Sequence, residues 1–135
     1  MRATGSFRVV SFVPAEVAPA PESIATALPV GVATMEKQFE GEVSGRSATL
    51  FTSAFDPVQG VGTYVAMESF DGSLNGVAGT FNFAHAATTH GSDRAAEHFV
   101  IVPSSGTGDL AGIAGSGGLS VDDGIHRIWF DYELR

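Results

Sequence analysis

The sequence predicts an all-β fold of about eight short strands with little helix, which close into a barrel or pack as a sandwich. Alternation of apolar and polar residues recurs along the chain, whereas helical periodicity is almost absent. Turn signals rich in Gly, Asn and Asp divide the alternating segments into short lengths. A chain of 135 residues suits a single core, so we expect residues 1–135 to form one domain.

Eight segments have the alternation expected of strands. Their approximate ranges are 5–12, 33–41, 46–54, 61–71, 79–88, 96–103, 115–121 and 126–134. The turn signals between them are Gly41 to Gly45, Asp56-Pro57 with Gly60, Asn75-Gly76, His90 to Asp93 and Asp122-Asp123-Gly124. Most connections are therefore expected to be tight hairpins.

One connection is long. Residues 13–31 contain four prolines, so this segment is not expected to form a central strand. It is either a surface loop with one helical turn near residues 23–28 or a lid over the mouth of the barrel.

A glycine-spaced motif occurs twice, as GSLNGVAGT at 72–80 and GDLAGIAGS at 108–116, with five of nine positions identical. The first copy centres on Asn75-Gly76, a strong signal for a two-residue hairpin turn. The second copy is expected to reverse the chain too, either as a hairpin or as one helical turn that closes a barrel end. Neither copy has the lysine and spacing of a phosphate-binding loop.

The Asn75-Gly76 turn fixes a register in which Leu74 pairs with Val77. Directly opposed residues share a face of the sheet, so one face carries an acid, an imidazole and several rings. Its members are Tyr64, Glu68, Phe70, Phe81, Phe83 and His85. This aromatic face is the expected interior of the barrel.

An acid beside an imidazole among aromatic rings suits general acid or base chemistry. The same pair is also compatible with a purely structural hydrogen bond. On the last strand Ile128, Phe130, Tyr132 and Leu134 alternate inward, and Tyr132 is either a proton donor or a core tyrosine. The candidate catalytic residues are Glu68, His85 and Tyr132, and the candidate substrate-binding residues are Tyr64, Phe70, Phe81, Phe83 and Phe130.

Composition limits the partners and cofactors. A net charge of -8 disfavours nucleic acid and anionic membrane surfaces as partners. The four histidines, at 85, 90, 98 and 126, match no ligand spacing, so we expect no metal and no cofactor. Zero cysteines, no secretion signal and no apolar run of ~20 residues together predict a cytoplasmic protein.

The ordered motifs FEGEVSG, YVAMESFDGSL, GTFNFAH, SGTGDLAGIAG and FDYEL resemble a bacterial family, domain of unknown function 3224. The resemblance covers nearly the whole chain. It implies that residues 1–135 form a single closed antiparallel β-barrel, similar to those of allene oxide cyclase and dirigent proteins. The family has no established reaction. Its pattern matches at Glu68, His85, Gly106, Gly108, Gly112 and Tyr132, whereas Phe99 stands where tryptophan is common.

Enzymes with such barrels cyclise or isomerise small reactive molecules without a cofactor. The resemblance therefore implies a cofactor-independent cyclase, isomerase or lyase that holds a small, largely apolar metabolite in the barrel lumen. The alternative is a non-catalytic barrel that binds or carries such a molecule. A third possibility is an interaction module, a homodimer or higher homo-oligomer that buries Trp129.

Overall fold

The computed structural model describes all residues, 1–135, and contains the predicted eight strands in one antiparallel sheet. The strands are β1 (Arg2–Ala15), β2 (Val30–Gly41), β3 (Val43–Asp56), β4 (Val61–Leu74), β5 (Val77–His90), β6 (Asp93–Ile101), β7 (Ile113–Asp122) and β8 (Ile125–Leu134). All eight predicted strands are confirmed, and most extend beyond the expected ranges because the tight turns leave few residues unpaired.

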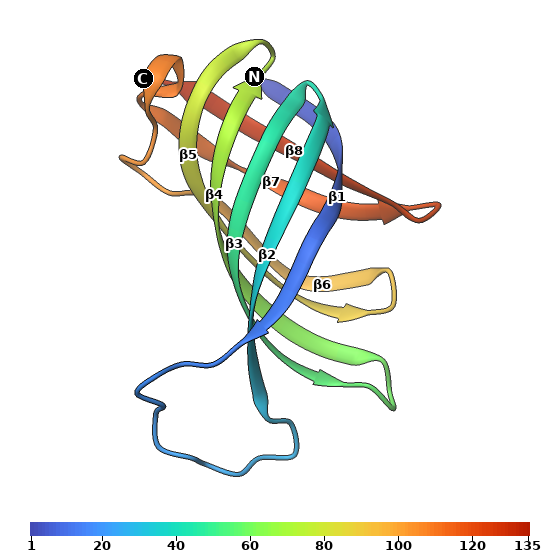
Figure 1. Cartoon of the computed structure of the whole chain (residues 1–135). Helices are drawn as coiled ribbons and strands as arrows, with labels where there is room; N and C mark the ends of the chain where they lie inside the picture. Colours follow the sequence, from blue (N-terminus) through green and yellow to red (C-terminus); the bar gives the residue numbers. More distant parts are fainter.

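The sheet coils into a barrel that is nearly closed (Figure 1). The strand order is β6-β5-β4-β3-β2-β1-β8-β7, so β6 and β7 are the two edges of the sheet. These edges lie against each other without a ladder of backbone pairs. We refer to this junction between β6 and β7 as the seam.

β1 is paired on both sides for only part of its length. It pairs with β8 from Arg2 to Phe7, and beyond that point it pairs with β2 alone. Pro14, which lacks a backbone N–H, is accommodated opposite Ala33 because the other edge of β1 is free there.

The long connection is shorter than the predicted range of 13–31. β1 continues to Ala15 and β2 begins at Val30, so the connection comprises residues 16–29. It has no helical turn and extends away from the barrel (Figure 1).

The predicted register of the β4–β5 hairpin is confirmed: Leu74 pairs with Val77, and Ala66 pairs with His85. The aromatic face points inward as expected. Its phenylalanines join apolar residues from the other strands and from the 102–112 connection in one core. The core is made of Ala3, Phe39, Val43, Phe70, Leu74, Phe81, Phe83, Ile101, Leu110, Ile113, Leu119, Ile128, Phe130 and Tyr132.

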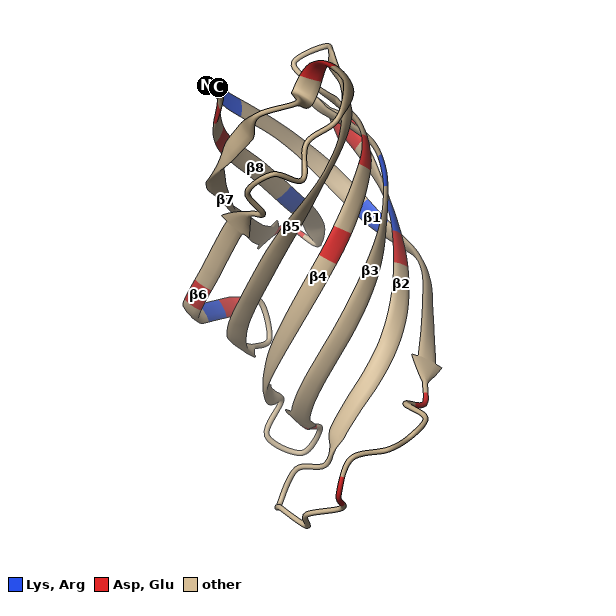
Figure 2. Cartoon of the chain, turned by 90° about the vertical axis from the view of Figure 1, so that its left-hand side faces the viewer, with Lys and Arg blue, Asp and Glu red and all other residues tan.

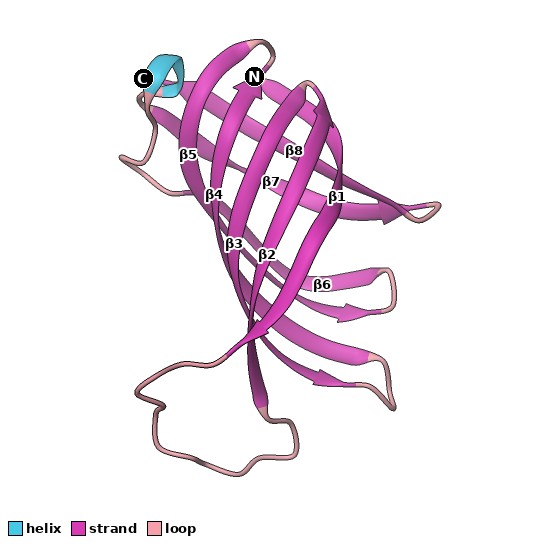
Figure 3. Ribbon diagram, in the orientation of Figure 1, coloured by secondary structure: helices cyan, strands magenta, loops and turns pink.

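The second glycine motif forms a single helical turn, Gly108–Leu110, rather than a hairpin. This turn, cyan in Figure 3, closes one end of the barrel and buries Leu110 completely. Gly79, from the first motif, allows its close approach: a Cβ there would lie 2.2 Å from the Thr107 carbonyl oxygen. The two motifs thus pack against each other at the same barrel end.

Charged residues are unevenly spread over the barrel. In the half of β2, β3, β4 and β5 farthest from the chain termini, these strands carry no charged residue except Asp56 at the end of β3 (Figure 2). No helix in the structure has the length and apolar character needed to cross a membrane.

Candidate functional site

Glu68 is the centre of a buried polar network. It lies on the inner face of β4 and is 0% exposed. Lys37 Nζ on β2 donates to its Oε2 at 2.9 Å, and Ser47 Oγ on β3 donates to its Oε1 at 2.8 Å. His85 Nε2 on β5 lies 2.5 Å from the same Oε2. Three strands therefore supply hydrogen bonds that compensate for burying the carboxylate.

The network continues from His85 toward the seam. The Tyr64 hydroxyl lies 2.7 Å from His85 Nδ1, and Arg94 Nη2 on β6 donates to that hydroxyl oxygen at 2.6 Å. Arg94 Nε also donates to Glu97 at 2.7 Å. We refer to the chain of Glu68, His85, Tyr64 and Arg94 as the relay.

The hydrogen bonds of the relay all run in one direction, from Arg94 to Glu68. Arg94 only donates, so the Tyr64 oxygen accepts from Arg94 and the Tyr64 O–H points to Nδ1 of His85. Nε2–H then donates to the Glu68 carboxylate. We assign His85 this neutral, Nε2-protonated form from its partners.

Burial and pairing together set the ionisation states. Burial alone would raise the pKa of Glu68, but the hydrogen bond from His85 and the charge of Lys37 outweigh it and lower the pKa to about 2. Burial lowers the pKa of His85, although Glu68 opposes this effect. Burial also raises the pKa of the Tyr64 hydroxyl, against the influence of Arg94. At neutral pH the relay therefore holds a carboxylate, a neutral imidazole and a neutral phenol.

A cavity of about 200 Å³ adjoins the relay at the seam, and we call it the seam cavity. Its walls come from both edges of the sheet and from its middle strands: Phe7, Val9, Met35, Lys37, Thr49, Phe51, Tyr64, Ala66, His85, Arg94, Leu119, Ser120, Val121 and His126. A dry cavity of about 150 Å³ can hold benzene, so this somewhat larger space suits a small molecule with a single ring.

The structure brings some of the predicted site residues together. His85 and Tyr64 line the seam cavity, and Glu68 lies directly behind His85. Tyr132 lies apart from them, and its buried hydroxyl accepts a hydrogen bond from Asn75 Nδ2 at 3.0 Å.

The four phenylalanines predicted to bind substrate do not line the seam cavity. Phe70, Phe81, Phe83 and Phe130 pack against one another with ring centroids 5.1–6.3 Å apart. They fill the closed part of the barrel instead. The four histidines do not gather with other side chains into a group that could hold a metal ion.

Sequence reasoning missed most residues of the seam cavity, among them the polar residues Lys37, Thr49 and Arg94. The alternation of inward and outward residues could have revealed the first two. In β2, Lys37 falls at an inward position between Met35 and Phe39. In β3, Thr49 falls at an inward position between Ser47 and Phe51.

Arg94 has no such signal. A bulge between Ala86 and Thr88 shifts the register of β5 with β6, and a local pattern does not reveal it.

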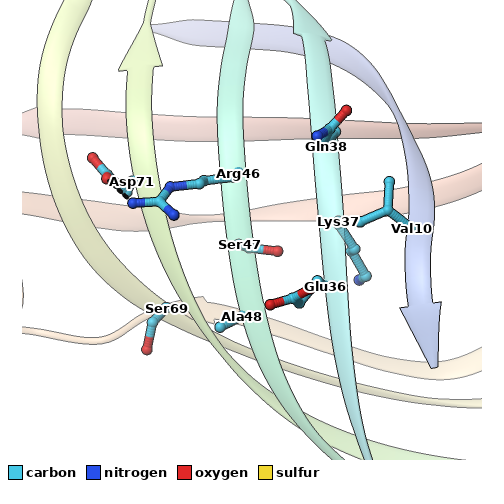
Figure 4. Close-up of a pocket in the computed structure, with 9 residues that line it drawn as sticks. All are labelled: Val10, Glu36, Lys37, Gln38, Arg46, Ser47, Ala48, Ser69 and Asp71. Atoms are coloured by element: carbon cyan, nitrogen blue, oxygen red, sulfur yellow. Dashed lines mark hydrogen bonds and ion pairs between the residues drawn. The ribbon is translucent and has the colours of Figure 1, made fainter. Parts of the chain in front are cut away.

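A second hollow, of about 410 Å³, is lined by residues of β1 to β4 and is largely polar. Figure 4 shows Arg46 extending toward Asp71 there, and the two form an ion pair at 3.3 Å. Only two of its nine lining residues are hydrophobic. This composition does not suit a largely apolar ligand, so the seam cavity is the better candidate site.

Comparison with known proteins assigns a family but no activity. Residues 3–132 match the model of DUF3224, described as a protein of unknown function. A crystal structure of a protein of unknown function from the DUF3224 family of Shewanella oneidensis MR-1 has 30% sequence identity and a TM-score of 0.83. The match covers 100% of this chain and 98% of that one. No curated protein matches the chain. The chain therefore belongs to the DUF3224 family.

Proposed function

We propose that the protein is a cofactor-independent isomerase or cyclase that transfers protons on a small, largely apolar molecule in the seam cavity. The observation that carries this proposal is the relay itself, which runs from the buried Glu68 through His85 to a tyrosine hydroxyl in the cavity wall. A carboxylate, an imidazole and a hydroxyl in hydrogen-bonded series form the arrangement that activates a hydroxyl group for proton transfer.

The relay supports a balanced proton transfer. The Tyr64 oxygen takes a proton from a carbon next to a substrate carbonyl, while the Tyr64 proton passes to Nδ1 of His85. The electron pair of the broken C–H bond moves into an enolate. The imidazolium that forms is stabilised by the Glu68 carboxylate, 2.5 Å from Nε2. Reversal of the transfer at the same or another carbon completes an isomerisation.

In this scheme Tyr64 and His85 are the catalytic residues, and Glu68 is a positioning residue. Glu68 holds the imidazole in the form whose Nδ1 is free to accept a proton. Arg94 donates to the Tyr64 oxygen and stabilises negative charge that develops there.

Hydrogen exchange into a simple ketone tests the proposal. Cyclohexanone in D₂O should take up deuterium next to its carbonyl faster with the protein than without it, as measured by mass spectrometry. Substituting His85→Asn should remove most of the acceleration, whereas His98→Asn, at an exposed histidine, should leave it unchanged. Equal rates in all three proteins would contradict the proposal.

The second candidate is a non-catalytic carrier, and the complete pairing of Glu68 favours it. A carboxylate with three hydrogen-bond partners also has a structural role, because it links the inner faces of four strands. A carrier would bind cyclohexanone without any exchange that depends on His85.

A further inference from the structure

Thr49 is one of the residues that line the seam cavity, and its buried hydroxyl has no partner. Its side chain lies on the inner face of β3 and is 3% exposed. Thr49 Oγ1 has no hydrogen-bond partner in the protein, and it is the one buried side-chain nitrogen or oxygen in this condition. A buried hydroxyl without a partner costs about 1–3 kcal/mol, so such a group calls for a functional explanation.

The charged residues that line the seam cavity are both basic, Lys37 and Arg94, in a chain whose net charge is -8. Their acidic partners Glu68 and Glu97 do not line it. An ammonium carries three N–H donors and a guanidinium five, and neither accepts a hydrogen bond. The cavity wall therefore carries the hydrogen-bond donors of these two residues, each paired with a carboxylate outside the wall, and no carboxylate of its own.

The donors near Thr49 converge on one region of the sheet. Thr49 stands directly opposite Glu68 in the β3–β4 pair, and Lys37 Nζ reaches the same Glu68 from β2. The Tyr64 hydroxyl lies on the other side of the His85 imidazole, at Nδ1, whereas Glu68 and its partner Lys37 lie at Nε2. An acidic group held near Thr49 and Lys37 would therefore be separated from the reacting carbon at Tyr64.

We propose that the ligand of the seam cavity is a small organic acid whose carboxylate accepts hydrogen bonds from Thr49 and Lys37. This inference rests on the proposed function and names the substrate class of the same site. The apolar body of the acid lies against Met35, Phe51 and Ala66, between the carboxylate and the relay. Thr49 is thus a specificity-determining residue that contacts the substrate away from the chemistry.

Benzoate and nitrobenzene test the proposal, because they share a shape and differ in charge. In calorimetric titrations of the wild-type protein, benzoate should bind at least about tenfold more tightly than nitrobenzene. Thr49→Val keeps the side-chain shape and removes the hydroxyl, so benzoate affinity should fall about tenfold while nitrobenzene affinity is unchanged. Thr34→Val, on the exposed face of β2, is the matched control and should change neither affinity.

Thermal unfolding without a ligand gives a second readout. Thr49→Val should raise Tm, because it removes a buried hydroxyl that has no partner, whereas Thr34→Val should leave Tm nearly unchanged. A lower Tm for Thr49→Val would show that the hydroxyl is paired in the free protein and would overturn the proposal.

The outcomes separate this inference from the proposed function. Nitrobenzene binding that equals or exceeds benzoate binding overturns the organic-acid inference and leaves a cavity for neutral molecules. Unchanged benzoate affinity in Thr49→Val overturns the role of Thr49. Failure of both probes to bind overturns the cavity as a ligand site, and with it both proposals.

Discussion

Tyr64 and Glu68 contact opposite nitrogens of the same imidazole, that of His85: the phenol lies at Nδ1 and the carboxylate at Nε2. The two residues are four positions apart on β4, so both project from one face of the same strand. His85, on the neighbouring strand, faces Ala66 between them. A small residue at position 66 therefore leaves room for the ring to bridge the two groups.

Replacing Tyr64 with Phe should slow proton exchange about a hundredfold or more, because the variant lacks the hydroxyl that meets the substrate. Binding of cyclohexanone should change little, since the ring that lines the cavity remains. Exchange kinetics and titration calorimetry measure the two effects separately.

The only other tyrosine provides the control. Tyr132→Phe removes a buried hydroxyl that binds Asn75 away from the relay, so the exchange rate should be kept. Equal slowing in the two variants would mean that Tyr64 has no special role in proton transfer.

Lys37→Met should destabilise the fold by about 3–5 kcal/mol, because it leaves the Glu68 carboxylate buried without its cationic partner. Adding Glu68→Gln should restore part of that stability, since the double variant buries no uncompensated charge. Urea unfolding of the two single variants and the double variant measures the coupling. Strictly additive effects would show that the ion pair contributes little.

The protein should lose stability in two stages on acidification. The pKa of His85 is lowered by folding, so below its ordinary value of 6.5 the unfolded chain binds more protons and unfolding becomes easier. The pKa of Glu68 falls from 4.5 to about 2, so a second loss, on the order of 3 kcal/mol, occurs as pH drops through this window.

Urea unfolding at a series of pH values measures both stages. Glu68→Gln has no carboxylate to protonate at this position, so its stability should vary less with pH between 4.5 and 2. A pH profile identical to that of the wild type would place the acid sensitivity elsewhere in the molecule.

Gly79→Ala should destabilise the protein by about 1–3 kcal/mol, because the new methyl group would overlap the Thr107 carbonyl oxygen and displace the helical turn at 108–110. Gly31→Ala is the matched control, since nothing lies within 4 Å of a Cβ added there. Its effect on stability should stay within about 0.5 kcal/mol. A loss at Gly79 no larger than that at Gly31 would mean that the turn adapts freely.

The strands and one hairpin register were predictable because both depend on local patterns. Alternation marks the strands, and Asn75-Gly76 fixes the pairing that places Glu68 and His85 on one face. The contents of the lumen were not predictable in the same way. Whether inward phenylalanines fill the barrel or line a space depends on how rings from distant strands pack, and Phe130 reaches Phe81 and Phe83 from the last strand.

The seam has a consequence for how the cavity exchanges its contents. Widening a fully hydrogen-bonded barrel requires breaking a ladder of backbone bonds, whereas Arg94 of β6 and Leu119 of β7 face the cavity from two edges that no ladder joins. Separating β6 from β7 beside the cavity therefore breaks no backbone ladder. The seam is thus the side of the barrel where a molecule can pass at the lowest cost in hydrogen bonds, while Phe130 of β8 holds the core against Phe70.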